Sequence, residues 1–187
     1  MVIAIIISIL TVLFMAFTIV LWIVGGELFF MAPNYNKIDR YLSKNIDTLS
    51  HVSEYLLEMD YDTITIHRLP MHEDEKYNLS MNISKNGFYD DGSRKTNSET
   101  IPIPNEILNN IINLYERGVS HISCSRNFVG FTLWEFMDDI RGIEYSRSGK
   151  KPDGVQLIEI KQLSIPNWYY YIHNFEKWKT QNPHLFP

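Results

Sequence analysis

The chain has 187 residues, of which 45% are hydrophobic, 21% charged and 13% aromatic, and its formal net charge is −5 at pH 7. This length suits one domain of ordinary size plus a short accessory segment. The apolar content excludes a disordered protein, and 17 basic against 22 acidic residues argue against a nucleic-acid-binding surface. A single cysteine, Cys124, excludes an internal disulfide and a multi-cysteine metal cluster.

The N-terminal segment, residues 2–24, contains no charged side chain. As a helix rising ~1.5 Å per residue it would be about 35 Å long, enough to cross a hydrocarbon core of ~30 Å. It lacks the basic flank and short apolar core of a signal peptide, and helix-ending Gly25, Gly26 and Pro33 follow it. We therefore predict a single-pass transmembrane anchor at residues 1–26, a short linker at 27–33 and one soluble domain at 34–187. The lipid bilayer is then the partner of residues 2–24.

A helix is predicted at residues 35–59, where a stripe of mostly apolar residues recurs every three or four positions: Tyr35, Ile38, Leu42, Asn45, Leu49, Val52, Leu56 and Met59. One interpretation is a coiled coil in which Asn45 fixes the register. The other is an amphipathic helix that packs on the sheet of its own domain. The apolar face is wider than a coiled-coil seam, which favours the second interpretation.

The remaining elements follow from alternation, helical spacing and turn residues. Two further helices are expected at 104–117 and 175–180, and a turn-rich loop at 86–93. Alternating apolar and polar residues predict strands at 63–69, 77–84, 119–124, 128–136, 143–146, 155–163 and 168–173. This order predicts an α+β fold with a mostly antiparallel sheet and helices packed on one face.

Motifs for phosphate binding, dinucleotide binding and hydrolysis are absent from the sequence, so we expect no cofactor. The run from His72 to Glu75, with His67 nearby, lacks a second pair of ligands at fixed spacing, and we expect no metal site. His121 and Cys124 stand three residues apart on a predicted strand. Their side chains then point to opposite faces and cannot form a nucleophile pair.

Three basic residues crowd the loop at 146–154: Arg147, Lys150 and Lys151. In a membrane-anchored protein this loop could contact anionic lipid, with ~1 kcal/mol for each charge. The alternative is an ordinary hairpin tip.

An aromatic run occupies the predicted strand at 168–173, and three of its side chains share one face: Tyr169, Tyr171 and His173. If that face is open, these residues form an exposed strip for a partner protein or a glycan. If the strand is covered on both sides, both sets of side chains are buried and the run has no binding role.

One resemblance rests on residues 142–171. Gly142-Ile143-Glu144-Tyr145-Ser146, a basic turn with Gly and Pro, an alternating strand and then Asn167-Trp168-Tyr169-Tyr170-Tyr171 follow one another. This arrangement resembles the C-terminal part of small uncharacterised bacterial membrane-anchored or lipoprotein domains. The resemblance implies a bacterial source and a strand at 168–173, and it implies no activity.

Three hypotheses for the function follow. The first is a membrane-anchored, non-catalytic interaction or accessory domain, a binding or immunity-like module with an unidentified protein partner. The second is a small hydrolase or metal-dependent enzyme whose residues meet only in three dimensions, drawn from His67, His72, Cys124 and Asp138. The third is a structural subunit that forms homo-oligomers through the span and the helix at 35–59. The absence of a catalytic motif favours the first.

The orientation in the cell membrane gives a first testable prediction. Lys37, Arg40 and Lys44 follow the predicted span and no basic residue precedes it, so the positive-inside tendency places the domain in the cytoplasm. Protease added to intact spheroplasts should leave the C-terminus protected, as measured by immunoblot, and should digest it after lysis. Digestion without lysis would reverse the orientation.

Overall fold

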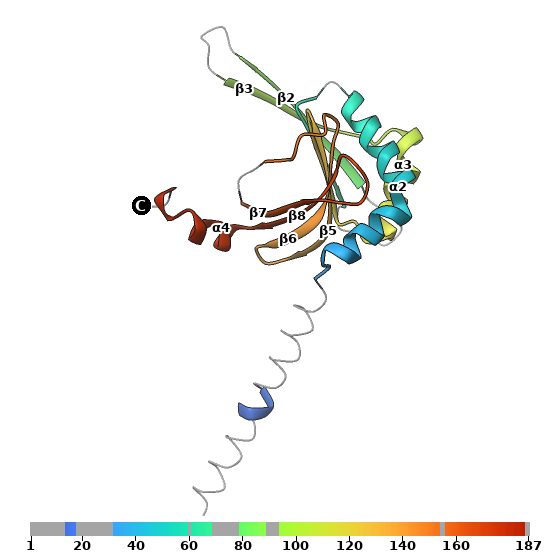
Figure 1. Cartoon of the computed structure of the whole chain (residues 1–187). Helices are drawn as coiled ribbons and strands as arrows, with labels where there is room; N and C mark the ends of the chain where they lie inside the picture. Colours follow the sequence, from blue (N-terminus) through green and yellow to red (C-terminus); the bar gives the residue numbers. More distant parts are fainter. Residues whose placement is uncertain are drawn as a thin grey trace, which may run out of the picture. The chain divides into compact units, whose positions relative to one another are not determined.

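The computed structural model describes residues 14–17, 32–59, 61–68, 79–88, 94–153 and 156–185 (Figure 1). The chain divides into two compact units, Met1–Pro33 and Asn34–Pro187. In the first unit, residues 14–17 are helical and Phe14, Met15 and Phe17 are exposed. Among the described residues, no helix is both long and apolar enough to cross a membrane. The predicted span at residues 2–24 lies outside the described residues except for 14–17.

The second unit is an α+β fold built on one eight-stranded antiparallel sheet, as predicted from the sequence. The strand order is β3-β2-β1-β4-β5-β6-β8-β7, and every pairing is antiparallel. The strands are β1 (Thr63–Arg68), β2 (Leu79–Phe88), β3 (Arg94–Ile101), β4 (His121–Ser125), β5 (Phe128–Phe136), β6 (Asp139–Ser146), β7 (Leu157–Gln162) and β8 (Trp168–Asn174).

The long helix α2 (Tyr35–Glu58) begins at Asn34, whose side chain accepts a hydrogen bond from the Lys37 backbone N–H at 3.1 Å. Its stripe is buried within its own domain, from Ile38 and Leu42 to Leu56. Asn45 is buried too, and its amide donates to the Tyr41 carbonyl and accepts from Arg117. The interpretation as an amphipathic helix on the sheet is therefore confirmed, and Asn45 is satisfied by groups of its own domain, without a coiled-coil partner.

Helix α3 (Asn105–Glu116) packs beside α2 on the same side of the sheet (Figure 1). Gly118 ends it as predicted, with φ of +100° in the left-handed region. The Tyr115 hydroxyl donates to the Ile66 carbonyl at 2.7 Å and ties α3 to β1. Between these helices and the sheet lies the core, which includes the buried strand residues Ile64, Ile66, Met81, Ile83, Ile122, Val129, Phe131 and Ile143. A short helix, α4 (Phe175–Gln181), and a 3-10 turn (Pro183–Leu185) follow β8.

The prediction that a loop begins at residue 86 is wrong, and the strand that follows the loop was not predicted. Strand β2 continues to Phe88, and Arg94–Ile101 forms the edge strand β3, paired with β2 from Met81↔Ile101 to Phe88↔Arg94. The sequence of β3 is almost entirely polar, so no alternation marks it. Its backbone pairing with β2 determines the structure there, because an edge strand can expose polar side chains at little cost.

The face of the sheet away from α2 and α3, here called the polar face, carries side chains paired across neighbouring strands: Thr65 with Ser123, His67 with His121, and His121 with Thr132. Tyr171 of β8 lies across this face. A Cβ on Gly142 of β6 would stand 2.7 Å from the Tyr171 hydroxyl and 2.2 Å from the Phe131 carbonyl oxygen. Only glycine therefore allows the tyrosine to cross β6, and its hydroxyl reaches Thr132 Oγ1 on β5 at 3.1 Å.

The prediction of an exposed aromatic strip was wrong for the two tyrosines. Tyr169 and Tyr171 are only 6% and 7% exposed, while Trp168 and Tyr170 are buried on the other face. Tyr171 is covered because it lies against the sheet itself. Tyr169 is covered because the connection between β6 and β7 folds over it, and its hydroxyl donates to the Gly149 carbonyl at 2.8 Å. The strand is thus covered on both sides, the alternative that the sequence left open.

The crossing of Tyr171 over Gly142 predicts a large effect of one methyl group. Gly142→Ala should lower the free energy of unfolding by about 1–3 kcal/mol, because the new Cβ meets a backbone oxygen and the tyrosine at once. Gly130→Ala is the matched control, since its Cβ would stand 3.0 Å from the Ser123 side-chain oxygen and at an ordinary 3.9 Å from the Ser123 backbone oxygen. Urea unfolding of the full chain in detergent micelles measures both. Equal, small losses would show that both the Tyr171 side chain and the backbone at Phe131 can move aside.

Candidate functional site

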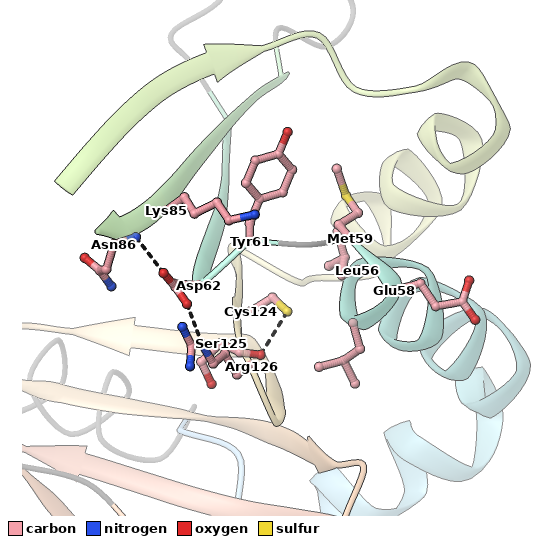
Figure 2. Close-up of a pocket in the computed structure, with 11 residues that line it drawn as sticks. Leu56, Glu58, Met59, Tyr61, Asp62, Lys85, Asn86, Cys124, Ser125 and Arg126 are labelled. Carbon is pink, nitrogen blue, oxygen red and sulfur yellow. Dashed lines mark hydrogen bonds and ion pairs between the residues drawn. The ribbon is translucent and has the colours of Figure 1, made fainter. Parts of the chain in front are cut away.

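Two hollows of the domain are lined by ionisable, hydroxyl or thiol side chains that could take part in binding or catalysis. The first, shown in Figure 2, is a cleft of about 300 Å³ where the end of α2 meets β1, β2 and the turn between β4 and β5. Its apolar wall comes from the end of α2, and its polar wall from strand ends. The lining includes Leu56, Met59, Tyr61, Asp62, Lys85, Cys124 and Arg126.

Asp62 is the central charge of this cleft, and its carboxylate is already satisfied. It accepts a hydrogen bond from the Asn86 backbone N–H at 2.5 Å and forms an ion pair with Arg126 (Figure 2). The Asn86 hydrogen bond and then the Arg126 guanidinium lower the pKa of Asp62 below its usual range. The carboxylate therefore joins β1, β2 and the turn between β4 and β5 as a structural tie.

Cys124 lines the same cleft but is not an activated nucleophile. Its thiol is buried and donates to the Ser125 carbonyl at 3.3 Å. Burial raises the pKa of this thiol to about 12, so the reactive thiolate is essentially absent at neutral pH. His121, three residues earlier on the same strand, lies on the polar face of the sheet, while Cys124 belongs to the core on the helix side. The two side chains diverge, as predicted from their spacing.

The three basic residues predicted to bind lipid, Arg147, Lys150 and Lys151, do not have the same surroundings. The Arg147 guanidinium donates to the Leu57 carbonyl at 3.3 Å, which places a positive charge at the C-terminal end of α2. Lys150 and Lys151 are exposed on the connection between β6 and β7. Contact of this loop with anionic lipid stays a prediction.

The second hollow, of about 210 Å³, lies on the polar face and contains two of the predicted binding residues, Tyr171 and His173. The strands β4, β5, β6 and β8 supply its lining. Sequence reasoning missed the other members: Ser123, Gly130, Thr132, Ile140 and Glu144. Its floor is low because Gly130 pairs with Ser123 and Glu144, and no side chain rises from that position.

Glu144 is the ionisable group that distinguishes this hollow. Its side chain is half-buried, and it has no hydrogen-bond or ion-pair partner among the described residues. Burial, and then the neighbouring Asp153 carboxylate, raise the pKa of Glu144 to about 7. Burial lowers the pKa of His173. Its ring contacts the Tyr171 ring edge to face, with centroids 5.1 Å apart. The hollow thus combines a poorly compensated carboxyl with aromatic and hydroxyl groups.

Two histidines meet beside the hollow, a pairing that sequence reasoning did not foresee. His67 of β1 and His121 of β4 are directly paired, and their ring centroids lie 4.6 Å apart. Burial, and then His67, lower the pKa of His121. Within the described residues, no group of three or more His, Cys, Asp or Glu side chains is placed to hold a metal ion. The run from His72 to Glu75 lies outside them.

The residues proposed for an enzyme do not gather in the described structure. His67 lies on the polar face, Cys124 lies on the helix side, and Asp138 stands in the turn between β5 and β6. His72 lies outside the described residues.

Comparison of the chain with protein-family models, with curated proteins and with solved structures finds no match.

The raised pKa of Glu144 predicts a pH-dependent stability. The unfolded carboxyl has a pKa of about 4.3, so the folded protein loses stability as pH rises from about 4 through 7, where burial opposes ionisation. Glu144→Gln does not titrate. The difference of nearly three pKa units corresponds to ~3.5 kcal/mol, and solvent screening at this half-buried side chain reduces it. The free energy of unfolding of Glu144→Gln, relative to the wild-type chain, should therefore rise by about 2–3 kcal/mol between pH 4 and pH 8.

The exposed Glu54 on α2 provides the control, since Glu54→Gln should leave the pH dependence unchanged. Urea unfolding at both pH values measures the difference. A constant offset between Glu144→Gln and the wild-type chain at all pH values would contradict the prediction.

Proposed function

We propose that the protein is a membrane-anchored, non-catalytic binding module, and that the hollow on the polar face is where its partner protein binds. Residues 2–24 anchor the chain in the cell membrane, and the domain at 34–187 lies in the cytoplasm. The absence of charge from residues 2–24 and the basic residues that follow them support the anchor and its orientation.

The observation that carries this proposal is the position of Glu144 in the hollow. A half-buried carboxyl with a raised pKa costs stability when it ionises. The structural carboxylate of Asp62, by comparison, accepts hydrogen bonds from a backbone N–H and from a guanidinium. Glu144 has no comparable partner among the described residues. Groups that a fold leaves poorly compensated are concentrated at functional sites, which favours a binding role.

A binding role accounts for the hydroxyl groups of the hollow better than catalysis does. The Thr132 and Tyr171 hydroxyls hydrogen-bond to each other at 3.1 Å, and among the described residues neither has a hydrogen bond to a histidine or a carboxylate. An activated nucleophile needs such a base within hydrogen-bond reach. In the described part of the hollow, these groups supply polar recognition instead.

Site-specific photo-crosslinking tests the proposal. A photoreactive amino acid replaces Ser123, which is exposed within the hollow, or Asn109, which is exposed on α3. In membranes of the source organism, the full chain should crosslink to a defined partner from position 123 and not from position 109. Ser123→Arg should abolish capture of that partner, because its long side chain fills the hollow, whereas Asn109→Arg should not.

Capture that survives Ser123→Arg, or no crosslink from position 123, would overturn the proposal. A crosslink from position 123 to another copy of the chain would identify the partner as a second copy of this protein, and the chain would then form a homo-oligomer.

A further inference from the structure

We propose that the hollow on the polar face binds a cationic side chain, the ammonium of a lysine or the guanidinium of an arginine of the partner protein, with Glu144 as its counter-charge. This inference rests on the proposed function and adds the chemical class of the group that is recognised.

The size of the hollow suits one side chain. Sites for drug-sized molecules occupy ~300–1,000 Å³, and this hollow has about 210 Å³. It is also open on the sheet surface, where a side chain can enter from a docked protein. Gly130 and Gly142 keep the floor free of side chains, and Tyr171 lies flat over Gly142 instead of standing in the opening.

The charges around the hollow favour a cation. Among the described residues, the full charges that act on Glu144 and Tyr171 are all negative: Glu144 itself, Asp153 and Glu135. They come from three places, β6, the connection between β6 and β7, and β5. His173 is the histidine of β8 and His121 the histidine of β4, and burial keeps both toward their neutral form. Two basic residues stand three positions from Glu144 in the sequence. Arg147 donates to the Leu57 carbonyl at the end of α2, and Arg141 forms an ion pair with Asp139.

The remaining lining fits the rest of such a side chain. Ile140 offers an apolar surface for the methylene stem of a lysine or arginine. The rings of Tyr171 and His173 meet edge to face and complete the lining beside Glu144. An incoming ammonium or guanidinium would give the Glu144 carboxylate the charge-assisted partner that it lacks in the described structure.

The test uses the full chain in lipid nanodiscs and three probes: N-acetyl-lysine methylamide, N-acetyl-arginine methylamide and the uncharged N-acetyl-norleucine methylamide. We expect one or both cationic probes to bind at pH 8, measured by NMR titration of the amides of Ser123 and His173. The norleucine probe should bind at least about tenfold more weakly, because a hydrogen bond to a charged group is lost.

Two variants identify the counter-charge. Glu144→Gln should weaken binding of the cationic probe about 10- to 100-fold, while Glu54→Gln should leave it unchanged. Lowering the pH from 8 to 5 should weaken binding roughly 100-fold in the wild-type chain, since Glu144 becomes protonated. Protonation of His173 would act in the same direction, and the smaller pH effect left in Glu144→Gln measures its share.

The outcomes separate this inference from the proposed function. Equal binding of norleucine and lysine probes, or full binding by Glu144→Gln, would overturn the cationic ligand. If Ser123→Arg still abolishes partner capture in that case, the binding module stands and Glu144 is not the counter-charge of its ligand. If the cationic probes fail to bind and Ser123→Arg retains capture, both proposals fail.

Discussion

The burial of one helix against one face of the sheet organises this domain. Helix α2 contacts β4, β5, β6 and β8, so it runs across the strands and covers several of them at once. Both its ends are attached. The Tyr35 hydroxyl donates to the Gln162 carbonyl at 2.9 Å, and Arg147 donates to the Leu57 carbonyl at 3.3 Å. With α3 beside it, α2 makes this face the core, and the other face is left for polar side chains.

That division determines which residues are available for recognition. On the core side, Cys124 is buried and its thiol stays protonated. On the polar face, the histidines, Ser123, Thr132 and Glu144 stand on neighbouring strands, where cross-strand pairing brings together residues from distant parts of the sequence. Asp62 and Glu144 show the contrast between two carboxylates of one sheet. The first is held by its partners for stability, and the second is partly buried without them.

Tyr171 and Gly142 connect the fold to the candidate site. The tyrosine can lie on the sheet because β6 has no side chain at Gly142, and its hydroxyl then meets Thr132 two strands away. A tyrosine and a glycine also meet in the basic loop, where the Tyr169 hydroxyl donates a hydrogen bond to the Gly149 carbonyl. The aromatic strand and the basic loop, which look independent in the sequence, are thus two parts of one packed arrangement.

The sequence by itself determined the α+β class, helices α2 and α3 and most of the strands. An element buried on one side has apolar residues that recur with a period of 3.6 in a helix or 2 in a strand, and this period is visible in the sequence. It did not determine β3, whose polar residues carry no period and whose structure comes from pairing with β2. It placed Tyr171 and His173 on one face, but it could not say that this face is covered at Tyr171 or that Glu144 lies beside them. Gly142, directly before the predicted strand at 143–146, was a signal of a close approach, but the sequence could not distinguish it from Gly130 inside the strand at 128–136. Exposure, the His67–His121 pair and the pKa of Glu144 depend on which strands are neighbours, and only the tertiary structure decides that.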